Sequence, residues 1–373
     1  MRITAVDIIP VAVPYKPEAG TVVTAGLQLT EARHLLIEVK TDDGIVGLGE
    51  AVPRPSVYGE TVESIVAALK SLLVPPILGM DPLDTERVWA KWDRVVASSS
   101  AKASLDMALG DIAGQAAGMP LYKMLGGWTD GRIRLTMPIA ITGRAGAVDQ
   151  AQAAVERGHQ WLKMKVGLDL RRDIDVVGAV RDAVGPGIGI YVDANQGYST
   201  ADALAAAEEF ARLRIALFEE PVAMGNFMGL SKLAHDGRMM LLLDEGILTP
   251  ADVARALSLG PSIAFSIRSP KTGFTWSRKI VGLIETANLT CLVGSHRELG
   301  IGTVASAHLG AAFRVMAYPA ELGVHVHLED GLLEEPLRFE GGEMILPKGP
   351  GLGVKLDRKS VERYRAGETI HIV

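Results

Sequence analysis

The chain has 373 residues, 48% hydrophobic and 22% charged, which suits one large domain and a smaller one. Its net charge is −6 without a basic block, which excludes a typical nucleic-acid-binding protein. Cys291, the single cysteine, excludes an internal disulfide framework, and no apolar run is long enough to span a membrane. We therefore expect a cytoplasmic protein without nucleic-acid or membrane partners, in which Cys291 is buried.

The N-terminal part predicts an antiparallel sheet followed by helices. Strand patterns cover Ile3–Val13, His34–Lys40 and Ile45–Glu50, and a turn at Thr41–Gly44 joins the last two. Helical periodicity then predicts three helices, at Thr61–Leu73, Thr85–Ala97 and Ser100–Ala117. Two stretches are predicted to be loops, Tyr15–Thr30 and Val52–Tyr58, and long loops of this kind often cover a functional site.

From Arg132 onward, short apolar strands alternate with alanine-rich helical segments. The predicted strands are Ile133–Ala140, Trp161–Val166, Ile188–Asp193, Ile215–Glu219, Met239–Asp244, Ile263–Arg268 and Leu289–Gly294. The predicted helices between them include Val148–Gly158, Asp173–Val184, Thr200–Leu213 and Pro250–Leu259. Strands and helices repeating every ~25 residues are typical of parallel β/α units, and this number of units favours a barrel over an open sheet.

The predicted fold class is α/β: a modified TIM barrel of seven or eight β/α units with an N-terminal α+β capping domain. Residues 1–127 are expected to form the capping domain and residues 128–327 the barrel. Residues 328–373 contain glycine-rich turns and are expected to pack back on the capping domain and complete it.

Charged residues recur at the ends of the predicted barrel strands. Lys165, Asp193, Glu219, Asp244 and Arg268 follow one another at intervals of 28, 26, 25 and 24 residues. In such a barrel the carboxyl ends of the strands meet at one face, where the chemistry is carried out. His296 and Glu298 follow the last predicted strand in the same way. The spacing therefore predicts one pocket that contains all of these side chains.

Lys163 and Lys165 lie one residue apart, so strand alternation places both on the same side. Two ammonium groups that share one face lower each other's pKa, which can make a lysine a proton acceptor. Two solvated lysines on an edge strand would give the same pattern. The neighbouring charges favour Lys165 as a general base assisted by Lys163.

Three carboxylates in one pocket would repel one another unless a cation lies between them. Oxygen ligands with room for a substrate suit Mg²⁺, and Mn²⁺ is an alternative. A divalent ion that binds a substrate carboxylate acidifies the neighbouring carbon and stabilises the enediolate that forms when a base removes its proton. Each acid taken alone could instead be a helix cap or a solvated group.

The motifs resemble the enolase superfamily, in the muconate-lactonizing (muconate cycloisomerase) branch of the mandelate racemase/muconate lactonizing enzyme family. The matching segments are Ala101–Gly114, Pro120–Gly127, Lys163–Lys165, Asp193–Asn195, Glu219–Pro221, Asp244–Glu245 and Pro350–Gly353. The resemblance implies that Asp193, Glu219 and Asp244 are the metal ligands. It also implies that the capping domain covers the barrel and that its two predicted loops select the substrate.

Two positions depart from the family pattern. The branch usually has a second lysine across the substrate, but alignment on Lys271–Thr272–Gly273 places Arg268 there. Arginine stays protonated and is a poor base, although it binds carboxylates and oxyanions well. His296 stands where the mandelate-racemase branch has its catalytic histidine, and Arg268 would lower its pKa; a polar loop residue is the other interpretation.

The catalytic candidates are therefore Lys163, Lys165, Arg268, His296 and Glu298. We expect removal of the proton α to a carboxylate by one base, in a cycloisomerisation or a syn elimination on a small carboxylate substrate, in a homo-oligomer. One alternative is a racemase or epimerase of an acid, N-acyl amino acid or dipeptide, with His296 as the second base. Another is a non-catalytic small-molecule binding protein on the same scaffold, and the sequence does not name the substrate.

Overall fold

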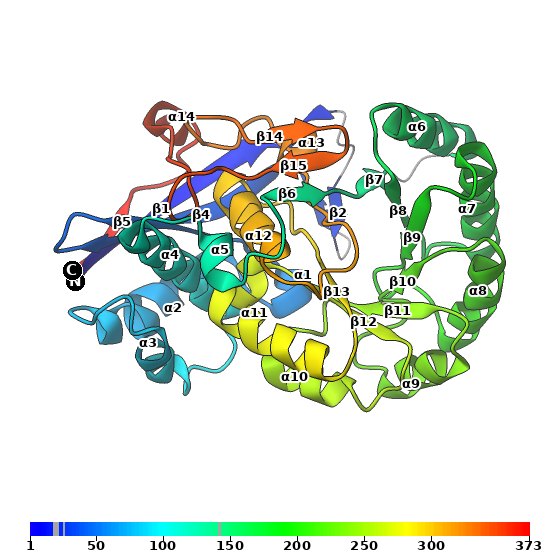
Figure 1. The fold of residues 1–373 in the computed structure, drawn as a ribbon, viewed down its shortest axis with the longest axis horizontal. Coiled ribbons are helices and arrows are strands. Elements are labelled where there is room, and N and C mark those ends of the chain that lie inside the picture. Colours follow the sequence, from blue (N-terminus) through cyan, green and yellow to red (C-terminus); the bar gives the residue numbers. More distant parts are fainter. Residues whose placement is uncertain (18–21, 25–26, 141–142) are drawn as a thin grey trace.

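The structure, a computed structural model, describes residues 1–17, 22–24, 27–140 and 143–373. An antiparallel sheet with its helices lies on the left of Figure 1, and a curved parallel sheet with outer helices lies on the right. None of the helices in the described residues combines the length and the apolar character needed to cross a bilayer.

The N-terminal sheet has the strand order β16-β1-β4-β5 and is antiparallel throughout. Its strands are β1 (Ile3–Pro14), β4 (Glu31–Thr41), β5 (Val46–Ala51) and β16 (Ile370–Ile372). The three predicted strands are confirmed, and so is the return of the C-terminal segment, because β16 pairs with β1. The proposed domain boundaries stay a prediction.

The helices of this part follow the sheet. They are α1 (Pro55–Tyr58), α2 (Val62–Ala68) with its π-helical continuation η2 (Leu69–Leu73), η3 (Pro75–Ile77), α3 (Thr85–Trp92), α4 (Ser99–Ala117) and α5 (Leu121–Leu125). Helix α4 packs on β5 so closely that a Cβ at Gly47 would lie 2.1 Å from the Ala108 carbonyl oxygen. The close approach of the helix therefore requires a glycine at position 47.

The two predicted loops contain secondary structure. Helix α1 lies within Val52–Tyr58, and strands β2 (Val22–Thr24) and β3 (Leu27–Leu29) pair within Tyr15–Thr30. These elements are too short to give a clear apolar period, which explains why the sequence did not predict them. Residues 18–21 and 25–26 of the predicted loop Tyr15–Thr30 lie outside the described residues.

Within the described residues, seven parallel strands form the curved sheet, in the order β13-β12-β11-β10-β9-β8-β7. The strands are β7 (Met137–Ile139), β8 (Trp161–Lys165), β9 (Gly189–Asp193), β10 (Leu217–Glu219), β11 (Met240–Leu243), β12 (Ile263–Ile267) and β13 (Cys291–Val293). The helices that connect or follow them are α6 (Arg144–Glu156), α7 (Leu170–Val184), α8 (Thr200–Arg212), α9 (Phe227–Asp236), α10 (Pro250–Ala256), α11 (Ser269–Thr286), α12 (Gly300–Ala312) and α13 (Val324–His327). Helices α6 to α9 lie along the convex side of this sheet (Figure 1). The α/β barrel prediction is confirmed.

The predicted strand Ile133–Ala140 is wrong as a single element. Its first half is β6 (Arg132–Arg134), which joins a separate antiparallel sheet, and its second half is β7. The partners of β6 in that sheet are β15 (Glu343–Ile345) and, beyond it, β14 (Arg338–Glu340). The remaining element is α14 (Arg358–Arg363), which precedes β16.

Residues 315–321 close the barrel between β13 and β7 without forming a regular strand. Parallel bridges join Met316 to Cys291 and Ala320 to Leu135. The backbone N–H of Glu321 also donates to the Val293 carbonyl, at 2.7 Å. This closure carries Glu321 to the same end of the barrel as the carboxyl ends of the strands.

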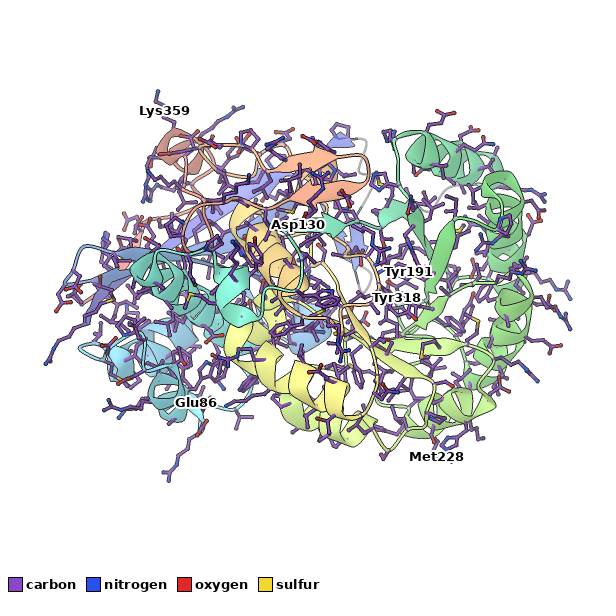
Figure 2. The ribbon with its side chains drawn as sticks, viewed as in Figure 1. Glu86, Asp130, Tyr191, Met228, Tyr318 and Lys359 are labelled. Carbon is purple, nitrogen blue, oxygen red and sulfur yellow. The ribbon has the colours of Figure 1, made fainter. Side chains whose placement is uncertain are left out.

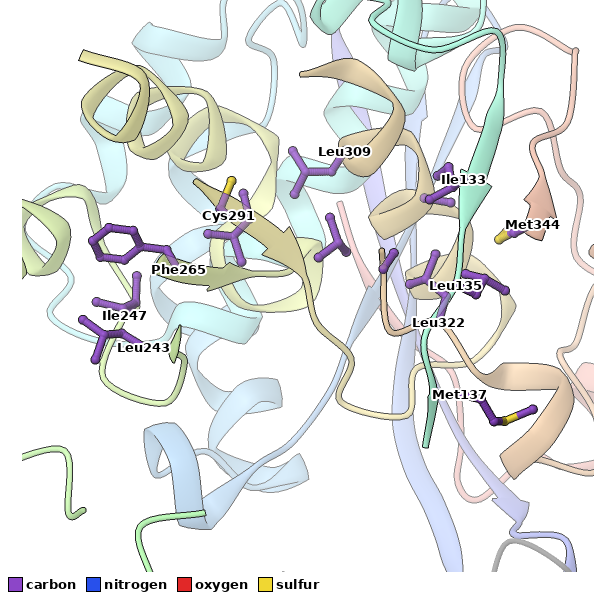
Figure 3. Close-up of a cluster of buried hydrophobic side chains, with 14 of the residues drawn as sticks. Ile133, Leu135, Met137, Leu243, Ile247, Phe265, Cys291, Leu309, Leu322 and Met344 are labelled. Atoms are coloured by element: carbon purple, nitrogen blue, oxygen red, sulfur yellow. The ribbon is translucent and has the colours of Figure 1, made fainter. Parts of the chain in front are cut away.

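The barrel is filled by side chains rather than open. Tyr191, Leu217, Leu242, Ala264 and Leu292 form a buried cluster inside it, and Figure 2 shows Tyr191 and Tyr318 close together near its centre. A second core lies outside the strands and extends to helix α12, where Cys291 and Leu309 are buried (Figure 3). The prediction that Cys291 is buried is confirmed.

One buried carboxylate anchors the C-terminal strand to β1. Asp7 Oδ1 lies 2.8 Å from Nδ1 of His371, its register partner on β16, and Asp7 Oδ2 lies 2.6 Å from Lys40 Nζ. Burial alone would raise the pKa of Asp7, but the bonds to Lys40 and His371 bring it below its ordinary value of 3.8. The ionised form therefore stabilises the fold above that pH, and the stabilisation is lost as the pH falls through the lowered pKa.

Replacing Asp7 with Asn is expected to lower the free energy of unfolding by about 0.5–1 kcal/mol at pH 7, because both partners are largely exposed. The difference from wild type should shrink as the pH falls below 4, where Asp7 becomes protonated in both states. Urea denaturation at several pH values measures both effects, with exposed Asp130→Asn as the matched control. A difference independent of pH would contradict the assignment.

Candidate active site

The strands bring the predicted side chains to one end of the barrel. In the strand register Lys165 is paired with Asp193 and Asp193 with Glu219, so the three residues lie at the same level. Asp244 directly follows β11, and Arg268 directly follows β12. The strand ends therefore meet as the spacing predicted.

Lys163 lies at the centre of a buried ionic cluster. Its Nζ is 2.9 Å from Asp193 Oδ2, 2.8 Å from Glu219 Oε2 and 2.8 Å from Glu321 Oε2, and its side chain is only 4% exposed. Burial would lower the pKa of Lys163, but these three carboxylates raise it well above its ordinary value. The expectation that the lysine pair lowers its own pKa is thus wrong for Lys163, because carboxylates are closer to it than the second ammonium.

Lys165 occupies a more open position. Its Nζ lies 2.5 Å from Asp193 Oδ2 and 2.7 Å from Asn195 Oδ1, and its side chain is 33% exposed. Both lysines thus bind the same oxygen of Asp193. Only Lys165 retains access to the mouth of the barrel, which is what a proton acceptor for a bound substrate needs.

Asp244 is held by two cations on the other side of the pocket. Arg268 Nη2 pairs with Asp244 Oδ2, and the buried Lys271 Nζ lies 3.0 Å from Oδ1 and 2.8 Å from the Asp244 carbonyl. Burial would raise the pKa of Asp244, but Arg268 and Lys271 hold it far below its ordinary value. Arg268 also donates to the Ser295 carbonyl at 2.7 Å, so it links the ends of β12 and β13.

Several carboxylates in this pocket are not fully compensated. Burial and the charges of Asp193 and Asp244 raise the pKa of Glu219 well above its ordinary value, despite the opposing effect of Lys163. Glu220 Oε2 and Glu245 Oε2 are buried without hydrogen-bond partners. Burial, with the charges of Asp244 and Asp193, raises the pKa of Glu245 to about 7. The raised pKa values favour the neutral forms of these groups, and a further cation beside them would favour their ionised forms.

Asp193, Glu219 and Asp244 fit a divalent cation by chemistry, because they form an all-oxygen donor set at three adjacent strand ends. Among the described residues, however, no three acidic or histidine side chains are already gathered as ligands. The Lys163 ammonium binds two of the carboxylates and the Arg268 guanidinium binds the third. A bound ion would therefore have to take over contacts that these two side chains make here.

His296 is buried beside Arg268. Burial, and then the charges of Arg268 and Arg54, lower its pKa well below the ordinary value, as expected from Arg268. Its Nε2 is buried without a partner, and its Nδ1 lies 3.3 Å from the Tyr58 hydroxyl. The imidazole is therefore neutral and has one ring nitrogen free.

Glu298 supports the loop that carries His296. Its carboxylate accepts hydrogen bonds from Ser295 Oγ at 2.6 Å and from the His296 backbone N–H at 2.8 Å. Both oxygens are thus used to shape the loop, which gives Glu298 a positioning role in this geometry. A direct catalytic role for Glu298 stays a prediction.

The N-terminal part contributes directly to this end of the barrel. Arg54 Nη2 donates to the His296 carbonyl, and Tyr58 lies against the His296 ring. The buried Glu50 accepts hydrogen bonds from the backbone N–H groups of Leu299, at 2.8 Å, and Gly302, at 2.7 Å. The helix dipole favours a carboxylate at the start of α12. Glu50 therefore ties the N-terminal domain to the loop that carries His296 and Glu298.

Sequence reasoning missed Glu321 and the structural role of Lys271. Glu321 follows a closing segment that contains Pro319 and lacks a strand pattern, so no strand end pointed to it. Lys271 was noticed only as an alignment marker, although a lysine one helical turn after Arg268 could have suggested a shared partner.

Comparisons with known proteins show relatives along nearly the whole chain. Residues 4–126 match the family model described as mandelate racemase / muconate lactonizing enzyme, N-terminal domain, and residues 146–360 match the enolase C-terminal domain-like model. The chain is 30% identical to the L-Ala-D/L-Glu epimerase of Clostridium acetobutylicum, over 93% of this chain and 96% of that protein. It is also 30% identical to the chloromuconate cycloisomerase of Cupriavidus pinatubonensis, over 89% and 92%.

A solved structure extends the comparison to three dimensions. The "muconate lactonizing enzyme from Mucobacterium Smegmatis complexed with muconolactone" superposes with a TM-score of 0.93 at 34% identity. It covers 98% of this chain and 100% of its own. These relatives are enzymes of the isomerase class, and they divide between cycloisomerisation and epimerisation.

Replacing Lys163 with Met is expected to lower the free energy of unfolding by about 3–5 kcal/mol in metal-free buffer, because the buried Asp193 and Glu219 and the partly buried Glu321 lose their shared cation. Lys165→Met is the matched control and should cost about 1 kcal/mol or less, because Lys165 is partly exposed. Urea denaturation measures both. Equal losses for the two variants would contradict the central role of Lys163.

Proposed function

The chain belongs to the mandelate racemase / muconate lactonizing enzyme family, and on that premise we propose that it removes the proton α to the carboxylate of a small acid. The reaction favoured is a one-base cycloisomerisation or syn elimination. The observation that carries this choice is Arg268, which stands across the strand ends from Lys165 and is paired with Asp244.

Asp193, Glu219 and Asp244 are the residues that would hold Mg²⁺, or Mn²⁺ in its place. When bound, the ion would hold the substrate carboxylate and stabilise the negative charge that develops on it. This assignment is supported by the all-oxygen donor set and by the raised pKa of Glu219.

Lys165 is proposed as the proton acceptor. Its ammonium position lies at the mouth of the barrel, whereas Lys163 is enclosed by three carboxylates that keep it protonated. Lys163 therefore contributes a fixed positive charge near the substrate carboxylate. The division of roles follows from the different burial of the two side chains.

Arg268 is proposed to stay protonated and to bind oxygen atoms. Burial would lower its pKa, but Asp244 raises it above the already high ordinary value. A guanidinium in this state cannot accept a proton from the opposite face of the substrate. It can hold a carboxylate or a developing oxyanion, and this supports the one-base reaction.

Racemisation or epimerisation is the second candidate function, and one observation favours it. His296 Nε2 is buried and has no partner, so a neutral imidazole is free to accept a proton. Its pKa is held so low, however, that it would be a weak base. A non-catalytic binding role on the same scaffold is the remaining alternative.

The test is α-proton exchange in D₂O with Mg²⁺ and a library of carboxylic acids, followed by NMR. The one-base proposal expects exchange that is lost in Lys165→Ala and retained in His296→Asn. Loss of exchange in both variants, with inversion in wild type, would favour the racemase. Absence of exchange with every acid would favour the binding protein.

Mg²⁺ is expected to raise the melting temperature, because it binds only the folded arrangement of carboxylates. Glu219→Gln should weaken Mg²⁺ binding by at least tenfold, about the scale seen when metal sites lose a supporting group. The exposed Glu208→Gln is the control and should bind Mg²⁺ like wild type. Thermal melting across a Mg²⁺ titration measures both; an unchanged response in Glu219→Gln would overturn the ligand assignment.

A further inference from the structure

One buried carboxylate joins the loops that follow β8 and β9. Asp173 lies in the first turn of α7, and it is 7% exposed. A single oxygen of this residue, Oδ2, accepts hydrogen bonds from the backbone N–H groups of residues 167, 168 and 169, at 2.8, 3.2 and 3.3 Å. The same oxygen accepts a hydrogen bond from the Tyr198 hydroxyl, at 2.6 Å. The chemistry proposed above uses none of these contacts.

The four hydrogen bonds reach two neighbouring strand ends of the barrel. Lys165 is the last residue of β8, and residues 167–169 follow it directly. Tyr198 lies in the loop after β9, three residues beyond Asn195. Successive backbone N–H groups at the start of a helix carry partial positive charge, which favours a carboxylate beside them. Asp173 Oδ2 therefore holds the first loop directly and the second loop through Tyr198.

The two loops also pack backbone against backbone. A Cβ at Gly167 would lie 2.5 Å from the Ala194 carbonyl oxygen, and a Cβ at Gly197 would lie 2.3 Å from the Gly167 carbonyl oxygen. The Tyr198 ring is 8% exposed and lies edge-on to Phe218 of β10, with 6.1 Å between the ring centres. Close packing of this kind leaves the two strand ends little freedom to shift relative to each other.

The group placed by this junction is the Lys165 ammonium. Its Nζ contacts Asp193 Oδ2 at 2.5 Å and Asn195 Oδ1 at 2.7 Å, and both of these partners belong to β9 or to the loop after it. Asn195 has a left-handed φ of +41°, and its N–H donates to Asp193 Oδ1 at 2.8 Å. A shift of the second loop relative to β8 would therefore change the position of Nζ. Misplacement of a reacting group by about 1 Å can cost about 10²-fold in rate.

We propose that Asp173 is a positioning residue for Lys165 and acts through the loop N–H groups and Tyr198. The inference rests on the proposed function, in which Lys165 accepts the proton. Capping of α7 does not account for Asp173, because the N-cap is Asp169, whose side chain accepts a hydrogen bond from the Arg172 N–H. The four bonds to Asp173 thus serve the two loops.

The test measures how fast the Lys165 amine is acetylated by an N-hydroxysuccinimide ester, using mass spectrometry at constant pH in metal-free buffer. The Lys165 side chain is 33% exposed and accessible to the reagent, and exposed Lys232 on α9 is the internal reference. Tyr198→Phe removes one hydrogen bond and keeps the ring. It should accelerate labelling of Lys165 relative to Lys232 by about threefold or more, because the amine is held less firmly by its two partners.

Two further variants control the result. Tyr318→Phe is the matched control, because the Tyr318 hydroxyl bonds to Thr290, which precedes β13 at the opposite end of the barrel from Lys165. This variant should label like wild type. Asp173→Asn keeps the shape but loses the charge that holds the N–H groups, so it should accelerate labelling of Lys165 at least as much as Tyr198→Phe. Circular dichroism checks that each variant is folded, and Tyr198→Phe alone decides if Asp173→Asn is not.

α-Proton exchange supplies a second measurement. With any acid that wild type exchanges, Tyr198→Phe should lower kcat by about tenfold and change KM by less than about twofold, because the placement of the base is altered and substrate binding is not. An unchanged kcat in a variant with faster labelling would overturn the inference.

The labelling result stands apart from the proposed function. Unchanged or slower labelling of Lys165 in Tyr198→Phe overturns the positioning role, and so does equal acceleration in Tyr318→Phe. If labelling is faster only in the Asp173 and Tyr198 variants but no acid undergoes exchange, Asp173 still positions Lys165, and the role of Lys165 as proton acceptor fails.

Discussion

The arrangement of charges at this end of the barrel depends on the ion pairs of the buried Lys163 ammonium. This ammonium joins carboxylates from β9, from β10 and from the closing segment, so three neighbouring parts of the barrel share one cation. Removing a buried charge from such a cluster leaves its partners unpaired in a medium that solvates them poorly. The closing segment is joined to its neighbours by isolated bridges and a few backbone hydrogen bonds rather than by a continuous ladder, and the contact between Glu321 and Lys163 adds to them. Structural integrity and the charge pattern of the site thus come from the same group.

The division of labour between the two lysines follows from this cluster. Alternation along β8 predicted that both point the same way, and it could not show that carboxylates would enclose one of them. The difference lies in depth: Lys163 is paired in register with Tyr191 inside the barrel, whereas Lys165 is paired with Asp193 at its rim. A lysine at the rim can contact a substrate directly. A lysine below the rim acts on the substrate only through its positive charge.

Much of the fold and of the site was predictable from the sequence because the β/α units and their strand-end charges recur at regular intervals. Strands, helices and strand-end charges recur at nearly constant intervals, and the register then brings Asp193 and Glu219 together. The predictions failed at the irregular elements. The strand predicted over Ile133–Ala140 is divided because β6 belongs to another sheet. Glu321 was missed for the same reason, since tertiary contacts rather than local periodicity define its segment.

The unpartnered buried atoms divide the pocket into two sides. Glu220 and Glu245 leave acceptor oxygens free near β10 and β11, where a cation would be stabilised. Arg268 and Arg297 leave donors free near β12 and β13, where oxygen atoms of a substrate would be stabilised. Among the described residues, Arg54 and Tyr58 of the N-terminal domain contact His296 on this second side. In the proposed function, the acceptor side would serve the metal-assisted chemistry and the donor side would bind the substrate. Glu50 of the N-terminal domain holds the start of α12, which follows the loop on the donor side.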